Sequence, residues 1–484
     1  MATQFIEQPS GRVGAKFDAM LGGPDTSAGE DQDASFDRVA STYVCHDKKF
    51  LVPQRTYDRQ YAQLYYARFQ LMTPPLKEVA AEKWPGVAFA KVLDVGNDKP
   101  ESEQPARLIV VGTIFKDQKL KPTVLDEYMK DRGMRAALDA TTFCSDDDIC
   151  ILEDDGGRMK LRGATLPVQQ LVTGVVIAVC GKAELGGDFF EVEEFCYLGL
   201  APQVPLPVPP ADAAGDKYVA LVSGLGLART GADPLKIQLA VDFLSGQLGG
   251  PNEQALASHV TRVIIAGGTV GGLEALATAA ANSRQQSAAM QPIKDMDLVV
   301  TELSAALPVD LMPGAEDPTN VALPQQPLHR CLFPGAAGYG SHNRVTNPHE
   351  FDVDGVGFLG TSGQNVDDIS KYSRHEDRLA MLELCLRWRH LAPTCPDTLT
   401  CYPYHDIDPF ILSSTPHVFF VGNQPEFAVG EISGPSGTRV RLVAIPAFHR
   451  TPMLVLVNLR TLDCHPISFE GADGCDVAKM DTGA

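Results

Sequence analysis

Several features that commonly direct a functional assignment are missing from this chain of 484 residues. Its eleven cysteines include no Cys-x-x-Cys pair, the usual spacing of zinc and iron–sulfur ligands. The longest apolar run, Leu171 to Cys180, is about half of the ~20 residues that span a bilayer. The first residues hold no apolar core of a secretory signal. We therefore expect a protein of the cytosol or nucleus, without a membrane contact and without a structural metal.

Basic side chains are also scarce. Lysine and arginine number 41 against 61 aspartates and glutamates, which gives a formal net charge of −20. A chain that grips a nucleic-acid backbone unaided needs a concentration of lysine and arginine, so this composition favours basic protein partners instead. The hydrophobic fraction of 44% is sufficient for large cores, and the length predicts two domains, or at most three.

The first half of the chain predicts a tail, a helix and a series of short strands. Residues 1–40 are rich in glycine, aspartate and serine, which indicates a flexible tail. Between Thr56 and Met72 aromatic and apolar residues recur at the helical period, and we expect Pro74-Pro75 to end this helix. A second helical segment is expected over 122–137. Alternating or β-branched runs predict five strands, at 107–115, 148–153, 158–162, 174–180 and 188–196.

Five short strands with one intervening helix are typical of a small closed barrel of the OB type. In the last strand Phe190 and Val192 alternate with Glu191 and Glu193, so one of its faces meets a core. Proline is frequent over 202–213, which predicts a linker. We therefore expect an OB-fold domain with its N-terminal helix over 41–201.

After the linker, strands alternate with helices. Strands are expected at 218–223, 263–266 and 309–312, with helices at 233–248 and 293–307 between them. A helix at 376–390 and strands at 417–421, 439–445 and 453–459 follow. The pattern predicts an α/β domain over 214–470 and a tail over 471–484. A functional site in such a domain lies at the carboxyl ends of the strands.

Glycine-rich strings follow the first three of these strands, and a similar string lies near the last ones. They are Gly224-Leu225-Gly226, Gly268-Thr269-Val270-Gly271, Gly314-Ala315-Glu316 and Gly422-Asn423-Gln424-Pro425. Their placement resembles that of the metal-binding motifs of the calcineurin-like metallophosphoesterase family. In that family the motifs are Asp-x-His, Gly-Asp-x-x-Asp, Gly-Asn-His-Asp/Glu and Gly-His-x-His.

Compared residue by residue, the metal ligands of that family are replaced here. The vacated positions are Gly224, Gly226, Gly268, Gly271, Ala315, Glu316, Asn423 and Pro425. A two-metal phosphoesterase needs carboxylate, imidazole and amide ligands to hold its ions and generate a hydroxide, and glycine and proline supply none of them. The resemblance thus implies an α/β sandwich of this family that lacks metal ligands, with no catalytic residue, no metal and no cofactor.

Two alternative functions stay open. A metal-dependent phosphodiesterase or nuclease could keep one degraded site, although helix caps and turns account for most of the candidate ligands. We expect Asp367-Asp368 to cap a following helix and Asp406 and Asp408 to lie in a turn. The candidates are Asp317, Asp367, Asp368, His390, His405, Asp406 and Asp408. The second alternative, a single-strand DNA-binding OB protein, is disfavoured because residues 145–196 hold four basic and eleven acidic side chains.

Longer strings carry a more specific resemblance. They include LVSGLGL (221–227), LMPGAEDPTNVALPQQPLH (311–329), FLGTSGQNVDDI (358–369), LRWRHLAPTCPDTLTCYP (386–403) and PHVFFVGNQP (416–425). These strings are similar to those of the B-subunit family of replicative DNA polymerases, and within it to the small (B, regulatory) subunits of DNA polymerase delta. The resemblance covers about residues 43–470.

This resemblance implies an OB barrel followed by an inactivated phosphoesterase domain, and a non-catalytic scaffold that works in the nucleus in DNA replication and repair synthesis. It also implies two direct partners, the cysteine-rich C-terminal domain of the polymerase catalytic subunit and a third, clamp-binding subunit. The sliding clamp and DNA would then be indirect partners.

Overall fold

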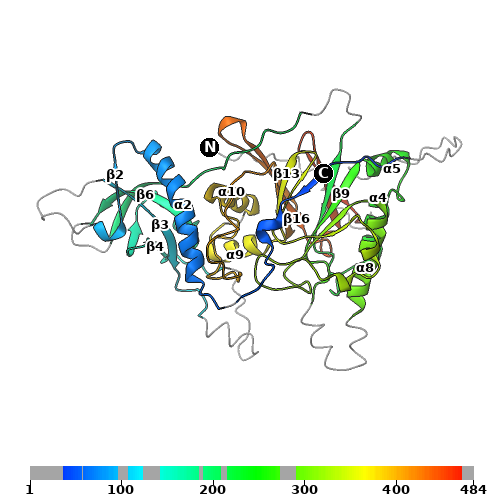
Figure 1. Cartoon of the computed structure of the whole chain (residues 1–484), viewed down its shortest axis with the longest axis horizontal. Helices are drawn as coiled ribbons and strands as arrows, with labels where there is room; N and C mark the ends of the chain where they lie inside the picture. Colours follow the sequence, from blue (N-terminus) through cyan, green and yellow to red (C-terminus); the bar gives the residue numbers. More distant parts are fainter. Residues whose placement is uncertain are drawn as a thin grey trace, which may run out of the picture.

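The computed structural model describes residues 36–56, 58–95, 107–123, 142–184, 189–208, 215–272, 290–375 and 377–470. Within them, three six-stranded sheets form an elongated molecule, with one sheet at one end and two at the other (Figure 1). No helix in this described part is both long and apolar enough to cross a membrane. Most of the expected tail 1–40, most of the expected helix 122–137 and all of the tail 471–484 lie outside the described residues.

The sheet at one end closes on itself. It contains β2 (Ala88–Ala90), β3 (Leu108–Asp117), β4 (Ile149–Glu153), β5 (Arg158–Arg162), β6 (Val176–Ala183) and β7 (Phe189–Cys196). The pairings run β3–β4–β5–β7–β6 and return from β6 to β3, and β2 adds to β3. All five expected strands are present within a few residues of their predicted bounds. Phe190 and Val192 of β7 are buried and Glu191 is exposed, which confirms the predicted alternation.

Helix α2 (Ala62–Lys83) packs along β3 and β6 and is longer than expected. The prediction that Pro74 and Pro75 end it was wrong, because the helix continues through both prolines. A proline has no N–H, so the carbonyls of Gln70 and Leu71 lose their helical donors. Both residues are exposed and accessible to water, which can replace those donors. The buried stripe that holds the helix in place consists of Leu64, Ala67, Arg68, Met72, Leu76 and Ala80.

The other two sheets pack face to face around a shared core that includes Ile264, Phe358 and Phe420. One sheet has the order β1 (Tyr43–Cys45), β12 (His349–Val353), β13 (Val356–Thr361), β14 (Val418–Gln424), β16 (Arg439–Pro446) and β15 (Ala428–Ser433). The order in the second is β11 (His342–Arg344), β10 (Val309–Met312), β9 (Val260–Ala266), β8 (Tyr218–Val222), β17 (Met453–Asn458) and β18 (Cys464–Ser468). We call the two sheets and their helices the sandwich unit.

Helices cover both outer faces of the sandwich unit. Helices α4 (Pro234–Ser245), α5 (Pro251–Ser258) and α8 (Gln291–Ala306) lie on the side of β8 and β9. Helices α9 (Gln364–Tyr372) and α10 (Arg378–Trp388) lie on the other side, between the sheets and the barrel end (Figure 1). The carboxylate of Asp233 accepts the N–H of Leu235 at 3.0 Å, so the predicted cap of α4 is confirmed. The helix ends at Gly246, earlier than expected, because this glycine adopts a φ of 80°.

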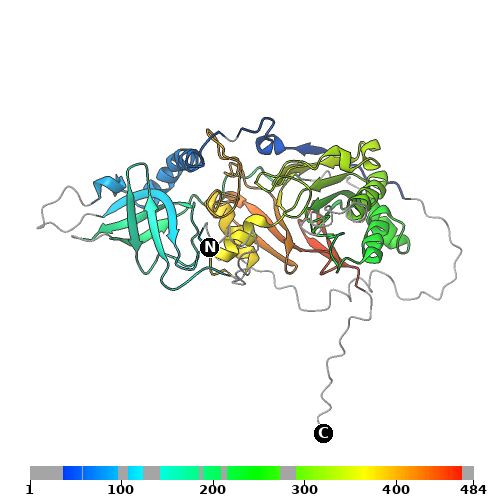
Figure 2. The same ribbon diagram turned by 90° about the horizontal axis from the view of Figure 1, so that it is seen from below.

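The segment before α2 belongs structurally to the sandwich unit. We expected the first domain to begin at residue 41, but β1 pairs antiparallel with β12. Arg38 also donates hydrogen bonds to the carbonyls of Leu244, Ala257 and Val260 at 2.7–2.8 Å. Figure 2 shows this blue segment running from the sandwich sheets to α2. Among the residues that the structure describes, the short helices are η1 (Asp47–Phe50), η2 (Val92–Asp94), η3 (Arg330–Leu332), η4 (Ala336–Gly338) and η5 (Pro435–Gly437).

Candidate functional site

The predicted vacated positions come together at the carboxyl ends of the strands. Gly224 follows β8, Gly268 and Gly271 follow β9, Ala315 and Glu316 follow β10, and Asn423 lies near the end of β14. These six residues line one cavity of about 220 Å³, which we call the strand-end pocket. Gly226 and Pro425 do not line it. The remaining lining residues are Arg229, Ser362, Gln364, Asp367, Ala447, His449 and Arg450.

The glycines of the strand-end pocket are required by the backbone. Gly224 and Gly268 have φ values of +64° and +70°, a region that glycine enters without strain. A Cβ atom at Gly224 would lie only 2.7 Å from the Cβ of Ala447. An aspartate or histidine at this position would therefore meet both backbone strain and a steric clash.

Asn423 is used by the fold. Its side-chain nitrogen donates to the carbonyl oxygens of Ala266 at 3.1 Å and Ser362 at 2.8 Å. The two carbonyls belong to different sheets, since Ala266 ends β9 and Ser362 follows β13. Asn423 thus ties the two sheets together at the pocket.

Asp317 organises the loops that surround the pocket. Its carboxylate accepts the backbone N–H groups of Gly268, Val270 and Gly314, each at 2.8 Å. Burial raises the pKa of this carboxyl, and the N–H groups offset part of that rise. Because both carboxylate oxygens are occupied by the backbone, Asp317 serves as a loop anchor.

Glu316 and His449 of the pocket are also engaged within the chain. Glu316 pairs with Arg229 at 2.5 Å and accepts the N–H of Gly272 at 2.8 Å. His449 contacts the carbonyl oxygen of Gly224 at 2.9 Å, and burial lowers the pKa of this imidazole. The pocket therefore offers no cluster of carboxylates and imidazoles that would hold a metal pair and activate water.

Among the described residues, the remaining candidate ligands do not gather into one group of three or more, although His390 contacts Asp408 and Asp367 lines the strand-end pocket. Asp367 and Asp368 lie inside α9, so the prediction that they cap a following helix was wrong, and Gly363 holds the N-cap position instead. Asp367 pairs with Arg378 at 3.2 Å, and Asp368 accepts the hydroxyl of Thr398 at 2.6 Å. His405 contacts the exposed Asp406. The predicted turn at Asp408 is present, because its carboxylate accepts the N–H of Phe410 at 3.0 Å.

Only one group of potential metal ligands gathers within 4.8 Å in the described part of the chain, and it contains none of these candidates. It consists of Cys45, Asp47 and His349. His349 lies between Asp47 at 2.8 Å and Asp310 at 3.4 Å, and Arg262 pairs with Asp310 from the other side. Burial lowers the pKa of His349, but the two carboxylates outweigh it and raise this pKa to about 9. His349, Asp47, Asp310 and Arg262 thus form a buried ion cluster.

A second buried ion cluster joins the barrel end to the sandwich unit, and sequence reasoning missed it. Arg68 of α2 is fully buried and pairs with Asp408 at 2.8 Å. Its other nitrogens donate to the carbonyls of Gly174 at 3.2 Å, Pro393 at 2.8 Å and Cys395 at 2.8 Å. His390 contacts the same carboxylate at 2.8 Å. The signal in the sequence that indicates a buried Arg68 is its position inside the apolar stripe of a helix, four residues after Leu64 and four before Met72.

The pKa values of Asp408 and His390 in this cluster both lie below their usual values. Burial raises the pKa of Asp408, but His390 and Arg68 hold it well below its usual range. Burial, and then the charge of Arg68, lowers the pKa of His390 to about 4. At neutral pH the cluster is therefore an Arg68–Asp408 ion pair with a neutral imidazole beside it. His390 and Asp317, which are both candidate metal ligands, lie at different places in the fold. His390 contacts Asp408 at this junction, whereas Asp317 accepts backbone N–H groups beside the strand-end pocket.

Comparisons with known proteins agree with this division of the chain. Residues 60–195 match a family model described as the OB-fold domain of a DNA polymerase delta subunit. Residues 219–429 match one described as the B subunit of DNA polymerase alpha/epsilon. Both models end within the described sheets, the first near the end of β7 and the second inside β15.

Full-length relatives extend the similarity beyond these models. The DNA polymerase delta small subunit of Arabidopsis thaliana is 45% identical over 441 residues, which cover 91% of this chain and 98% of that protein. DNA polymerase delta subunit 2 of Drosophila melanogaster is 35% identical, with 89% and 98% covered. The DNA polymerase delta small subunit of Saccharomyces cerevisiae is 32% identical, with 86% and 91% covered. On this evidence the chain belongs to the family of DNA polymerase delta small subunits.

Proposed function

We propose that this chain is a non-catalytic scaffold subunit of a DNA polymerase delta complex. It binds the cysteine-rich C-terminal domain of the catalytic subunit and connects it with a third, clamp-binding subunit. Through these two partners it contributes to DNA replication and repair synthesis in the nucleus. Membership of the small-subunit family supports the proposal.

The strand-end pocket is the observation that carries the non-catalytic part of the proposal. Its vacated positions are occupied by glycines with a positive φ, by Ala315, which has no ligand atom, or by side chains bonded to the chain itself. Asp317, which anchors the loops beside the pocket, accepts three backbone N–H groups. An active two-metal site needs several free ligands at the same positions.

We also propose specific fold families for the two units. The closed cycle of five strands supports an OB-type barrel. Two face-to-face sheets, with helices outside and a pocket at the strand ends, support a calcineurin-like phosphoesterase fold without its ligands. The acid excess over residues 145–196 supports a role of the barrel in contacting basic protein surfaces.

Assembly with the polymerase is the direct test. The full chain, produced together with the C-terminal domain of the polymerase catalytic subunit, is expected to elute as a one-to-one complex in size-exclusion chromatography with light scattering. The control replaces that domain with the C-terminal domain of an unrelated polymerase. Separate elution of the two proteins would refute the scaffold proposal.

A hydrolysis assay tests the competing function. The purified chain with Mn²⁺ and bis(p-nitrophenyl) phosphate is expected to show no turnover above that of buffer. Turnover that persists through purification and disappears in an Asp317→Asn chain would favour the degraded phosphodiesterase.

A further inference from the structure

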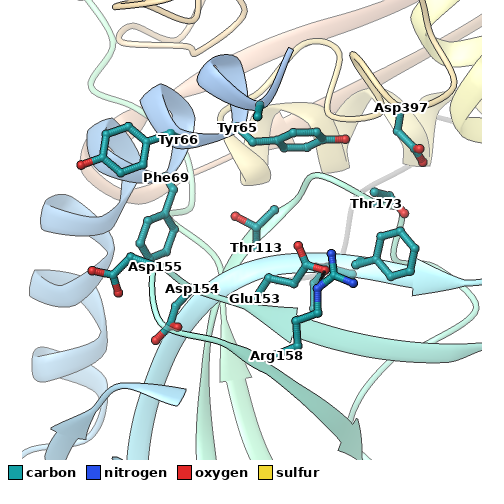
Figure 3. Close-up of a pocket in the computed structure, with 13 residues that line it drawn as sticks. Tyr65, Tyr66, Phe69, Thr113, Glu153, Asp154, Asp155, Arg158, Thr173 and Asp397 are labelled. Atoms are coloured by element: carbon teal, nitrogen blue, oxygen red, sulfur yellow. Dashed lines mark ion pairs between the residues drawn. The ribbon is translucent and has the colours of Figure 1, made fainter. Parts of the chain in front are cut away.

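A cavity lies between α2, strands β3 to β5 and the loop that carries Asp397. Its volume is about 410 Å³. Figure 3 shows aromatic side chains of α2 on one side of the cavity and acidic side chains of the barrel on the other. We call it the junction groove and define it by Tyr65, Tyr66, Phe69, Glu153, Asp155 and Asp397.

Exposed apolar surface lines this groove. Tyr66 is 57% exposed, and Tyr65 and Phe69 are half-buried. Leu93 of η2 is 56% exposed and lies beside the turn that contains Gly156, next to the acidic wall of the groove. Large apolar side chains that gather around a cavity commonly mark a binding surface.

The acidic wall of the groove keeps an excess of negative charge. Four carboxylates line the groove, and three of them have a cation: Arg158 at 2.8 Å from Glu153, Lys91 at 3.0 Å from Asp155, and Lys121 at 2.5 Å from Asp397. The fourth, Asp154, accepts the N–H groups of Val92, Gly156 and Gly157. The side chains of Asp155 and Lys91 are 40% and 64% exposed, and such surface pairs are weak enough to exchange for a cation from outside.

This combination selects one class of occupant. Aromatic faces and carboxylates both attract a lysine or arginine, whereas the carboxylates repel the phosphates of a nucleic acid. The exposed Tyr66 and Leu93 add an apolar surface beside the charges. We propose that the junction groove binds a segment of a partner protein that carries a lysine or arginine next to an apolar side chain. The inference rests on the proposed scaffold role and names a surface for it.

A labelled peptide tests the groove on the full chain. The probe is a short fluorescein-labelled peptide in which lysine and leucine alternate, and its binding is measured by fluorescence anisotropy. Tyr66→Ser is expected to weaken binding about tenfold and Asp155→Asn about threefold. Matched controls lie elsewhere: Tyr339→Ser removes a tyrosine that is 42% exposed, and Asp406→Asn removes an exposed carboxylate. Neither control is expected to change the affinity, and acetylation of the peptide lysines should abolish binding.

Several results would overturn the inference. Equal affinity of the peptide for all four variants would show that it binds through net charge alone. Displacement of the peptide by oligothymidylate, lost in Tyr66→Ser, would assign the groove to single-stranded DNA. Self-association of the chain in sedimentation, lost in Tyr66→Ser, would assign it to a second copy. If the peptide does not bind while the complex with the catalytic C-terminal domain forms, only the groove inference fails and the scaffold proposal stands.

Discussion

The strand-end pocket and the junction groove contain similar side chains but use them differently. Beside the pocket, Asp317 is saturated by backbone N–H groups, and in the pocket Glu316 pairs with Arg229 and accepts the N–H of Gly272. In the groove, Asp155 has a single exposed partner, and Tyr66 is largely open to solvent. A buried carboxylate that accepts hydrogen bonds within the chain contributes to stability, whereas an exposed carboxylate is available to a partner. We therefore expect substitutions at inner charges to affect stability and those in the groove to affect binding.

The largest effect is expected at the buried cluster between the two units. Arg68→Met removes the arginine donors of the Asp408 carboxylate and of three carbonyl oxygens, and it leaves that buried carboxylate without its cation. We expect a loss of about 3–5 kcal/mol in the free energy of unfolding, measured by denaturant titration. Arg158→Met, which removes an arginine that is 70% exposed, serves as the control and should cost less than about 1 kcal/mol. Equal losses in the two variants would contradict the distinction between inner and surface charges.

The next effect concerns His349 and is a dependence of stability on pH. The folded state raises the pKa of His349 from 6.5 to about 9, so it binds this proton more tightly than the unfolded state. The resulting stabilisation is fully present below about pH 6.5 and is lost as pH rises through about 9. The free energy of unfolding of wild type relative to His349→Gln is expected to fall by about 2–3 kcal/mol between these values. Parallel pH profiles would show that the imidazole is neutral in the fold.

A smaller loss is expected in the strand-end pocket itself. Asp317→Asn replaces one acceptor oxygen by an NH₂ group that faces backbone N–H donors. We expect a loss of about 1–3 kcal/mol in the free energy of unfolding, independent of added Mn²⁺. Asp406→Asn is the matched control, because its carboxylate is exposed. Stabilisation of wild type, but not of the variant, by micromolar Mn²⁺ would indicate a metal at this position.

The smallest effect on stability is expected in the junction groove. Asp155→Asn should change the free energy of unfolding by less than about 0.5 kcal/mol, because its partner Lys91 is exposed. Thermal unfolding followed by circular dichroism measures this change. A loss above about 1 kcal/mol would mean that Asp155 serves the fold, and the contrast with Asp317 would then disappear.

Local patterns in the sequence predicted those features that are determined mainly by residues adjacent in the chain. The alternation in β7 and the cap at Asp233 depend on adjacent residues, and both are present. The end of α2 and the position of Asp367-Asp368 depend on distant packing. Packing of α2 against β3 and β6 outweighs the two prolines, and α9, which begins at Gln364 after its N-cap Gly363, packs against α10. Strands β1, β2, β11, β12, β13, β15 and β18 and helices α5 and α9 were missed as short elements without a clear period.

The candidate site was predictable in part for a similar reason. Motif spacing placed six of the eight vacated positions in one pocket, because parallel strands align their carboxyl ends. The hydrogen bonds of Asp317 and the contacts of Arg68 join residues far apart in the chain, such as Arg68 and Asp408. A single sequence contains no signal for such pairs beyond a charge in an apolar stripe.

The path of the N-terminal segment makes the barrel an insertion in the sandwich unit. The chain supplies the edge strand β1 first, then enters the barrel through α2, and returns to the sandwich unit at β8. Asp47 of the same segment pairs with His349. A shortened chain that begins at Gly215 would thus lose an edge strand and uncover the buried imidazole.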